Sequence, residues 1–531
     1  MKHASLQHQP SNLIAGRWVP IPGTAIQSRN PAHPASIVYS GDSVRAHVDQ
    51  AVAAARSALG PWSRTPRQMR FEALRAFAEL CKTHAGPMAE LLCDEIGKVM
   101  WECKAEAGLL ASKVDITLDP APEGGLRRVT DFGFALTPSR LAKCLFKPHG
   151  VMAVLGPFNF PAHLPNGHIV PALAMGNTVI FKPSDKAPAV GQLLVELFDE
   201  ALRSAGAPAG VINLVQGGVD VASDLINHEG LDAIAFTGSW PVARRIMQAN
   251  LDRPGRILAL ELGGSNPAVV LADADPKLAA IEIARCAFNT TGQRCTCTRR
   301  AIIHRDIAAK VIPAICQIAS QLVIGHPRAS HPVFMGPLVA DASRRHLLQF
   351  QERAAKVGAS VLLAARSVEI AQGVDGQQSD GGYYVSPSVI EVERFTAAPP
   401  APLDGKSPFD PGCDEEVFGP LLRICIVDSE EHAFEQASAT RYGLAASIFT
   451  ADPAAAERFV VAVRAGCINI NTGTAGASSK LPFGGLGLSG NHRPAGSFAL
   501  DYCAYPVASM QETGNASLVA EGMRWDDAWI K

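Results

Sequence analysis

Two short stretches of this chain carry residue types that can do covalent chemistry. One is the run 292–297 (GQRCTC), and the other is 261–264 (ELGG), which begins 34 residues before Cys295. A cysteine in a glycine-led turn beside an arginine is a candidate nucleophile, because positive charge favours the reactive thiolate. A glutamate ahead of two glycines is a candidate base on a flexible backbone. Together they suggest chemistry that passes through a thioester and ends with water.

The composition of the chain narrows the class of protein. With 531 residues the chain is too long for one core, so we expect two or three domains. Hydrophobic residues make up 47% and charged residues 18%, which is typical of a soluble globular protein. The formal net charge of −2 provides no basic field, so nucleic acid is not an expected partner.

Targeting, membrane and metal signals are weak. Residues 1–12 lack the apolar core of a secretory signal, and the most apolar run, 169–181, is too short and too polar to span a bilayer. We therefore expect a cytoplasmic protein without a membrane partner. The 12 cysteines are scattered, which favours reduced thiols, and the step from Cys295 to Cys297 is not a zinc-ligand spacing, so no metal is expected.

Five short apolar runs alternate with helical patterns in the middle of the chain and predict parallel β-α-β units. In such sheets ligands bind at the carboxyl ends of the strands, so the loops after these runs form one candidate face. The runs are 151–155, 178–181, 211–215, 233–236 and 257–260.

The alternation restarts after about residue 266, which predicts a second α/β domain. Its first elements are expected as a strand at 268–271, a helix at 276–290, a strand at 299–304 and a helix at 306–322.

Further helices, an extended stretch and surface loops are expected outside the strands of these two regions. The helices expected before the first sheet span 43–60, 67–83 and 86–113. A Pro/Gly-rich break at 120–135 precedes an extended stretch, 136–150, that suggests an excursion toward a partner subunit. Gly/Pro/Asp/Ser-rich surface loops are expected at 366–382 and 396–412.

Seven motifs occur in the order in which the aldehyde dehydrogenase superfamily carries them, and through them the chain resembles that superfamily from about residue 12 to 510. Each motif alone is weak, whereas their joint order is specific. The motifs are 156–161 (GPFNFP), 182–184 (KPS), 236–239 (FTGS), 261–267 (ELGGSNP), 292–295 (GQRC), 416–420 (EVFGP) and 482–485 (PFGG).

The resemblance implies an α/β fold with a Rossmann-like dinucleotide-binding domain, an α/β catalytic domain and a small β excursion for oligomerisation. A homodimer or homotetramer is implied in the same way. The corresponding segments are 1–123 and 144–265 for the NAD-binding domain, 266–486 for the catalytic domain, 124–143 and 487–510 for oligomerisation, and 511–531 for a C-terminal tail.

The resemblance also assigns three catalytic roles. Cys295 matches the nucleophile, and Glu261 matches the general base that activates water for thioester hydrolysis. Asn159 matches the oxyanion donor, which acts with the backbone N–H of Cys295. Relatives that transfer the acyl group to coenzyme A lack this glutamate, so its presence implies a free carboxylic acid as product.

Six further residues match the family's cofactor site. Lys182 and Asp185 stand where relatives contact the adenosine ribose, and a carboxylate there would repel a 2′-phosphate, which favours NAD over NADP. The others are Gly238 and Ser239 for the pyrophosphate turn, and Glu416 and Phe418 for the nicotinamide ribose and ring. The family often has glycine four residues after that serine, whereas this chain has Ala243.

Three runs, 160–171, 293–300 and 489–494, resemble the branch that oxidises the small aldehyde N-succinylglutamate 5-semialdehyde in arginine degradation. Because that substrate carries two carboxylates, Arg493 and His163 are candidate pocket residues, and a scaffold or interface role is the alternative for each. Another acidic semialdehyde is the alternative substrate. A catalytically silent protein on the same fold is the third hypothesis, and the presence of both catalytic residues counts against it.

Overall fold

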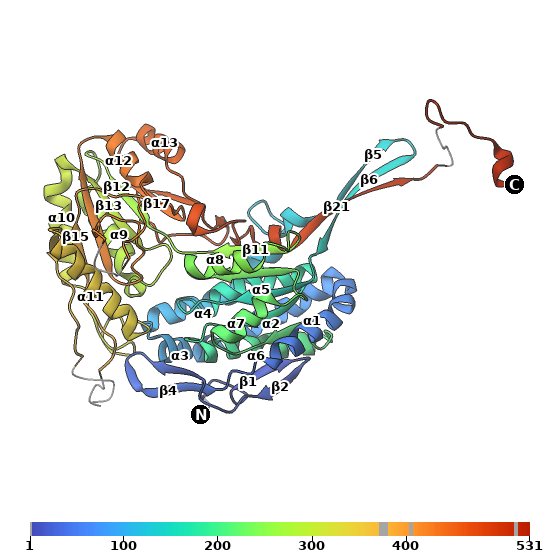
Figure 1. Ribbon diagram of the computed structural model, residues 1–531, viewed down its shortest axis with the longest axis horizontal. Helices are drawn as coiled ribbons and strands as arrows, with labels where there is room; N and C mark the ends of the chain where they lie inside the picture. The colour runs from blue at the N-terminus through green and yellow to red at the C-terminus, as the bar shows by residue number, and fades with distance from the viewer. Residues whose placement is uncertain (1–2, 371–380, 403–406, 515–518) are drawn as a thin grey trace.

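The computed structural model describes residues 3–370, 381–402, 407–514 and 519–531. Figure 1 shows two α/β bodies side by side, with a narrow β arm that projects from one of them and carries the C-terminal residues outward. Of the loops expected at 366–382 and 396–412, parts lie outside the described residues. Within the described residues, no helix is long and apolar enough to cross a membrane.

The first body is built on a seven-stranded sheet of order β11-β10-β7-β8-β9-β1-β2. The five strands from β11 to β9 in this order run parallel, as the apolar runs predict, and strands buried on both faces need such continuous runs. They are β7 (Val151–Leu155), β8 (Thr178–Lys182), β9 (Ile212–Leu214), β10 (Ala233–Thr237) and β11 (Ile257–Glu261). The strands β1 (Ser11–Ile14) and β2 (Arg17–Pro20) extend this sheet in the antiparallel sense, and β3 (Ile26–Asn30) and β4 (His33–Gly41) form a separate hairpin.

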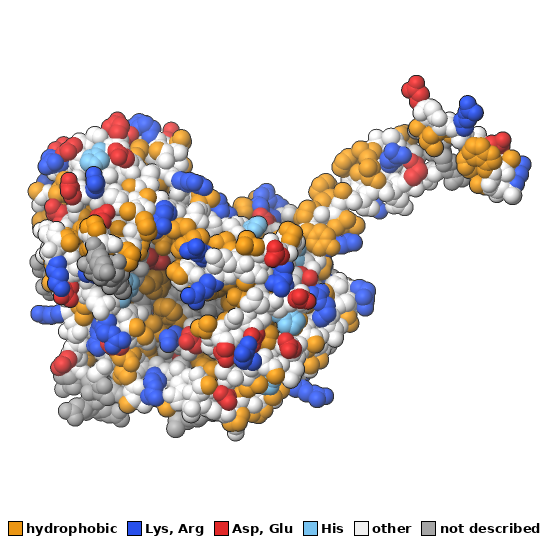
Figure 2. All heavy atoms as spheres, in the orientation of Figure 1, with side chains coloured by type: hydrophobic (Ala, Val, Ile, Leu, Met, Phe, Trp, Pro, Cys, Tyr) orange, Lys and Arg blue, Asp and Glu red, His pale blue; other side chains and the backbone are white. Residues whose placement is uncertain are grey.

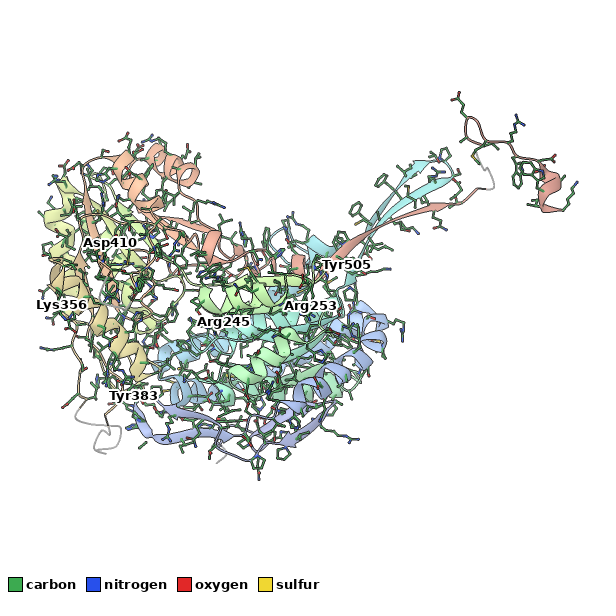
Figure 3. The ribbon with its side chains drawn as sticks, viewed as in Figure 1. Arg245, Arg253, Lys356, Tyr383, Asp410 and Tyr505 are labelled. Carbon is green, nitrogen blue, oxygen red and sulfur yellow. The ribbon has the colours of Figure 1, made fainter. Side chains whose placement is uncertain are left out.

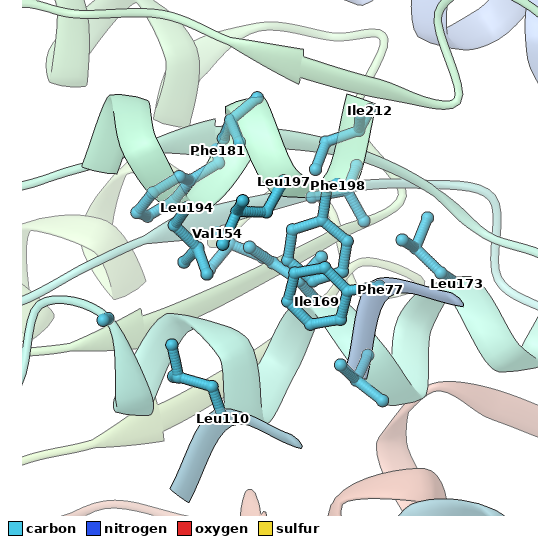
Figure 4. Close-up of a cluster of buried hydrophobic side chains, with 14 of the residues drawn as sticks. Phe77, Leu110, Val154, Ile169, Leu173, Phe181, Leu194, Leu197, Phe198 and Ile212 are labelled. Atoms are coloured by element: carbon cyan, nitrogen blue, oxygen red, sulfur yellow. The ribbon is translucent and has the colours of Figure 1, made fainter. Parts of the chain in front are cut away.

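Eight helices accompany this sheet among the described residues. Helices α2 to α6 and the end of α1 form one core, in which the rings of Phe77 and Phe198 stack with centroids 3.6 Å apart (Figure 4), whereas α7, α8 and the start of α1 pack in a second core. The first of these cores fixes α5, which carries candidate site residues at its start. The helices are α1 (Ala46–Arg64), α2 (Arg67–Thr83), α3 (Ala85–Ile96), α4 (Met100–Leu118), α5 (His163–Met175), α6 (Pro188–Ser204), α7 (Val219–Asn227) and α8 (Trp240–Ala249).

The single helix expected at 86–113 is wrong, because the structure has two helices there. The helix α3 ends at Gly97, whose φ of 76° is left-handed and suits glycine. A Cβ on Gly97 would lie 2.7 Å from Pro337, so the second body packs against this break. The chain then re-enters a helix at α4, which lies beside the site described below.

The second body has a seven-stranded sheet of order β14-β15-β16-β13-β12-β17-β18. All its neighbours pair in parallel except β14 with β15. The strands are β12 (Asn266–Val270), β13 (Thr298–His304), β14 (Ser360–Leu363), β15 (Ser388–Glu391), β16 (Leu421–Val427), β17 (Ala445–Phe449) and β18 (Cys467–Ile470). Its helices are α9 (Pro276–Phe288), α10 (Arg305–Ser320), α11 (Asp341–Lys356), α12 (Glu430–Ser438) and α13 (Pro453–Ala462).

The arm is a three-stranded antiparallel sheet of β5 (Phe132–Thr137), β6 (Arg140–Pro148) and β21 (Ala504–Glu512). Residues 487–503 lie outside the arm, and part of them returns to the first body, where Gly490 bridges to Glu261. Tyr505 lies at the base of the arm (Figure 3). Hydrophobic side chains gather along its surface (Figure 2), and Phe132 and Phe134 are more than half exposed.

Candidate active site

A cavity of about 490 Å³ lies at the carboxyl ends of β7, β8, β10 and β11. Strand ends meet there because the strands are parallel, so side chains far apart in sequence share one wall. The structure brings all the expected catalytic and cofactor residues together in this wall. They are Asn159, Lys182, Asp185, Gly238, Ser239, Glu261, Cys295, Glu416 and Phe418.

A second cavity of about 460 Å³ meets the first. Leu164 and Cys295 line both cavities, so the candidate nucleophile stands at their junction. The second cavity takes its walls from α4, from the start of α5 and from residues 475–480. A group bound in one cavity and a group bound in the other would therefore both reach the thiol.

A tight turn presents Cys295. After α9 ends, Thr290, Thr291 and Gly292 have φ values of 51°, 53° and 71°, a left-handed run that is costly for threonine and signals a constrained site. A Cβ on Gly292 would collide with the Gly419 carbonyl oxygen, so only glycine fits there. The Asn266 side-chain amide stabilises this turn by hydrogen bonds to its backbone.

The Asn266 Nδ2 donates to the carbonyl oxygens of Cys295 and Cys297, each at 2.8 Å. Cys297 is buried and lines neither cavity, and its Sγ lies 3.7 Å from the Asn289 Oδ1. Cys297 is thus a packed neighbour rather than a second nucleophile. All 12 cysteines are free thiols, as expected from their scatter.

The electrostatics at Cys295 differ from the sequence-based expectation. Burial raises the pKa of the Cys295 thiol well above its usual range, and the charges of Glu261 and Glu416 raise it further. Arg294, which the sequence suggested as a favourable neighbour for the thiolate, forms an ion pair with Glu102 at 2.9 Å instead. The thiol therefore needs a proton acceptor.

Glu261 ends β11 and is only 1% exposed. Neither of its carboxylate oxygens has a hydrogen-bond partner among the described residues. Burial raises the pKa of this carboxyl well above its ordinary value, and the Arg493 charge opposes part of the rise. An unpaired buried carboxylate is costly for stability, and such a group facing a cavity is typical of a functional residue.

Asn159 is fixed from two sides. Its side-chain Nδ2 donates to the Gln293 carbonyl at 3.0 Å, which leaves the second amide hydrogen for the cavity. The Lys98 ammonium donates to the backbone carbonyl oxygen of Asn159 at 3.0 Å and pairs with Glu106 at 2.6 Å inside the core. Lys98 and Glu106 were not predicted from the sequence. The sequence signal that could have indicated them is a pair of opposite charges within largely apolar stretches.

Glu106 connects this pair to α5. Its Oε1 accepts from the backbone N–H groups of Ala162 and His163, each at 3.1 Å, and so caps the start of the helix. The position of Asn159 relative to Cys295 thus depends on a buried ion pair from α3–α4 and on the turn before the cysteine.

With this geometry in place, the comparison with known proteins identifies the family. The sequence pattern of the aldehyde dehydrogenase family matches residues 18–506. The chain belongs to the aldehyde dehydrogenase family. A Caulobacter vibrioides protein named N-succinylglutamate 5-semialdehyde dehydrogenase 2 is 42% identical over 516 residues, which cover 96% of this chain and 98% of that protein.

Solved structures resemble the chain over almost its whole length. The chain is similar to HpcC from Thermus thermophilus, with a TM-score of 0.85 and 28% identity, covering 97% of this chain and 96% of the other. It is also similar to PnpE in complex with nicotinamide adenine dinucleotide, with a TM-score of 0.84 and 30% identity, covering 97% of this chain and 100% of the other. The aldehyde dehydrogenase fold is thus established for this chain.

In this aldehyde dehydrogenase, the first cavity offers groups that suit a dinucleotide. The Lys182 ammonium is buried, donates to the Pro183 carbonyl at 3.0 Å, and has a pKa that burial lowers to about 8. Asp185 is exposed at the rim. The side chain of Ser239, the N-cap residue of α8 at the cavity, makes no capping hydrogen bond to the helix, and a helix start of this kind suits a phosphate.

Glu416 and Phe418 line the same cavity, and the surrounding residues fix the position of each. The Glu416 Oε1 accepts from the Gly264 N–H at 3.1 Å, and a Cβ on Gly263 would collide with the other carboxylate oxygen. The Phe418 ring stands edge-on to Phe158 with centroids 5.9 Å apart. Ala243 lies on the buried face of α8 and does not line the cavity, so its methyl group leaves the turn at Gly238 and Ser239 open.

The two candidate substrate residues lie in different places. His163 lines the second cavity, and burial lowers the pKa of its imidazole to about 4, so the ring is neutral at pH 7. Arg493 lines neither cavity. Its Nη1 donates to the Gly485 carbonyl at 2.9 Å, and its charge acts on Glu261. The position of Arg493 therefore favours a scaffold role over a pocket role.

Proposed function

We propose that this aldehyde dehydrogenase catalyses the NAD-dependent oxidation of N-succinylglutamate 5-semialdehyde to N-succinylglutamate. The observation that carries the proposal is that Cys295 stands where two cavities meet, one suited to a dinucleotide and the other to an aldehyde. The 42% identity to a protein named for this substrate supports the choice of aldehyde. Another acidic semialdehyde is the alternative.

The reaction begins at the Cys295 thiol. Its proton passes to Glu261, and the sulfur forms a bond to the aldehyde carbon, which gives a thiohemiacetal. The Asn159 amide hydrogen that is not bound to Gln293, together with the Cys295 backbone N–H, stabilises the negative charge on the former carbonyl oxygen. Lys98 and Glu106 hold Asn159 in place for this step.

A nicotinamide dinucleotide in the first cavity supplies the acceptor for the hydride that leaves the thiohemiacetal carbon. Lys182 and Asp185 would hold its adenosine ribose, the start of α8 its pyrophosphate, and Glu416 and Phe418 its nicotinamide end. The carboxylate of Asp185 would repel a 2′-phosphate, which supports NAD over NADP. Similar solved proteins are complexed with NAD, as in PnpE, or with NADP, so they support a nicotinamide dinucleotide, and the preference for NAD rests on Asp185.

Hydrolysis completes the cycle. Glu261 first releases the thiol proton to bulk water and then removes a proton from the attacking water. The water oxygen adds to the thioester carbon, and the carbon–sulfur bond breaks to release the acid and the Cys295 thiolate. The raised pKa of Glu261 makes its carboxylate a stronger base than an exposed one. The unpaired oxygens of Glu261 support this role, and they support hydrolysis over acyl transfer.

We also propose that the arm formed by β5, β6 and β21 pairs with a second copy of the chain in a homodimer or homotetramer. Its support is the row of exposed apolar side chains on a sheet that has no body of its own to cover it (Figure 2).

The test of the proposed function is NADH formation by the purified protein. We expect kcat/KM for N-succinylglutamate 5-semialdehyde to exceed that for succinate semialdehyde and for glutamate 5-semialdehyde, with loss of the activity in Cys295→Ala. Cys297→Ala is the matched control and should keep the activity. Equal kcat/KM for the three aldehydes would refute the substrate assignment, and activity in Cys295→Ala would refute the mechanism.

A further inference from the structure

The second cavity contains a buried cation that has no carboxylate partner. Lys113, on α4, is only 3% exposed and lines this cavity. Its ammonium donates to the Gly496 carbonyl at 2.7 Å, and no ion pair to Lys113 occurs among the described residues. An ammonium can donate three hydrogen bonds, and a buried charge that lacks a partner is costly for stability.

The other buried lysines can be compared with Lys113 by the negatively charged partner that each has or is expected to bind. Three lysines are buried among the described residues: Lys98, Lys113 and Lys182. Lys98 lines neither cavity and pairs with Glu106 at 2.6 Å. Lys182 lines the first cavity and has no ion pair, and its partner is expected to be the cofactor. By the same logic, the missing partner of Lys113 is a ligand of the second cavity.

The neighbours of Lys113 strengthen this inference. His163 lines the same cavity, and its buried Nδ1 has no hydrogen-bond partner among the described residues. Burial lowers the pKa of the Lys113 ammonium to about 8, so it is mostly charged at pH 7. Lys480, an exposed residue, stands at the rim of the cavity, where it adds a second positive charge.

We propose that Lys113 binds a carboxylate of the aldehyde substrate at a position remote from the aldehyde carbon. The neutral His163 ring provides a further hydrogen bond beside it. This subsite makes the enzyme selective for aldehydes that bear a carboxylate. The identity of the natural substrate, the dianion N-succinylglutamate 5-semialdehyde, rests on the proposed function. The selectivity for a carboxylate rests on Lys113 itself.

The test compares two aldehydes of equal chain length that differ in one carboxylate, 5-oxopentanoate and pentanal. In Lys113→Gln the side chain still donates to Gly496 but carries no charge. We expect the ratio of kcat/KM for 5-oxopentanoate to that for pentanal to fall by about 10- to 100-fold, the range for loss of a hydrogen bond to a charged group. Lys104→Gln, which removes an exposed charge from the same helix, should leave the ratio unchanged.

The results test the carboxylate subsite and the proposed substrate separately. An unchanged ratio in Lys113→Gln overturns the carboxylate subsite, because a purely structural lysine would affect both aldehydes equally. If Lys113→Gln does not fold, Lys113→Met provides the same comparison, since an apolar replacement of an unpaired buried charge is tolerated. A reduced ratio, combined with no wild-type preference for the succinylated aldehyde, supports the subsite and refutes the substrate named above.

Discussion

The two cavities that meet at Cys295 are built in different ways. The first takes its wall from the ends of parallel strands, and each residue expected there from a motif lies there. The second takes its wall from one face of α4, from the start of α5 and from residues 475–480, and among the residues that line it alone only His163 was singled out from the sequence as a substrate contact. On the proposed function, we expect the strand-end cavity to determine the chemistry and the helix-and-loop cavity to determine the choice of aldehyde.

The largest effect is expected from the residue that both cavities share. Cys295→Ala should lower kcat by about 10⁴-fold or more for every aldehyde, because no other thiol lines the junction. Binding of NAD, measured by calorimetry, should persist. Residual turnover comparable to that of Cys297→Ala would contradict the assignment of the nucleophile.

The next effect concerns the oxyanion. Asn159→Ala should lower kcat by about 10²- to 10³-fold with both 5-oxopentanoate and pentanal, since the oxyanion is common to all aldehydes. Steady-state rates with saturating NAD measure this loss. A loss confined to the carboxylated aldehyde would move Asn159 from the catalytic site into the substrate cavity.

Cofactor choice should depend on the first cavity alone. Asp185→Ser removes the carboxylate at the rim and should raise the kcat/KM ratio of NADP to NAD by roughly tenfold, because repulsion of the 2′-phosphate is lost. The aldehyde preference should stay as in the wild type. An unaltered cofactor ratio would show that Asp185 does not contact this part of the dinucleotide.

The smallest effect distinguishes the two roles of Arg493. Because the Arg493 charge lowers the pKa of Glu261, Arg493→Ala should raise that pKa further and move the acid limb of the kcat profile to higher pH. At neutral pH the loss should be roughly fivefold and equal for charged and neutral aldehydes. An increase in KM for the dianionic aldehyde alone would instead return Arg493 to the substrate pocket.

The pH dependence of stability has a definite sign at the same site. The folded-state pKa of Glu261 is raised, so its contribution to the free energy of unfolding is largest below pH 4.5 and is lost as pH rises through the folded pKa. Glu261→Gln removes this titration. Compared with wild type, the variant should therefore lose less stability on going from acidic to alkaline pH in denaturant titrations.

The difference between the two cavities also explains which parts of the structure could be predicted from the sequence. The strand ends of the first sheet and residues such as Cys295 and Lys182 were predictable because their motifs are local in sequence. Lys113 was not, because no motif marks it within its helical stretch, and only packing shows that its ammonium lacks a carboxylate partner among the described residues. The break at Gly97 was also missed, since it depends on contact with Pro337 of the second body.

Arg493 shows the same limit from the other side. Its residue type suited a dianionic substrate, but a left-handed backbone with a φ of 52° and a bond to Gly485 direct the side chain away from the cavities. Side-chain direction in an irregular segment is set by tertiary contacts, which the sequence does not display.

The most direct test of the account is to trap the acyl-enzyme. Glu261→Gln is mixed with one equivalent of N-succinylglutamate 5-semialdehyde and excess NAD, and intact-protein and peptide mass spectrometry follow. We predict up to one equivalent of NADH, formed more slowly than by the wild type because the thiol has lost its proton acceptor, still slower release of the acid, and an N-succinylglutamyl thioester on Cys295. NADH formation without an adduct, or an adduct on Cys297, would contradict the assignment of Cys295 as nucleophile and Glu261 as hydrolytic base.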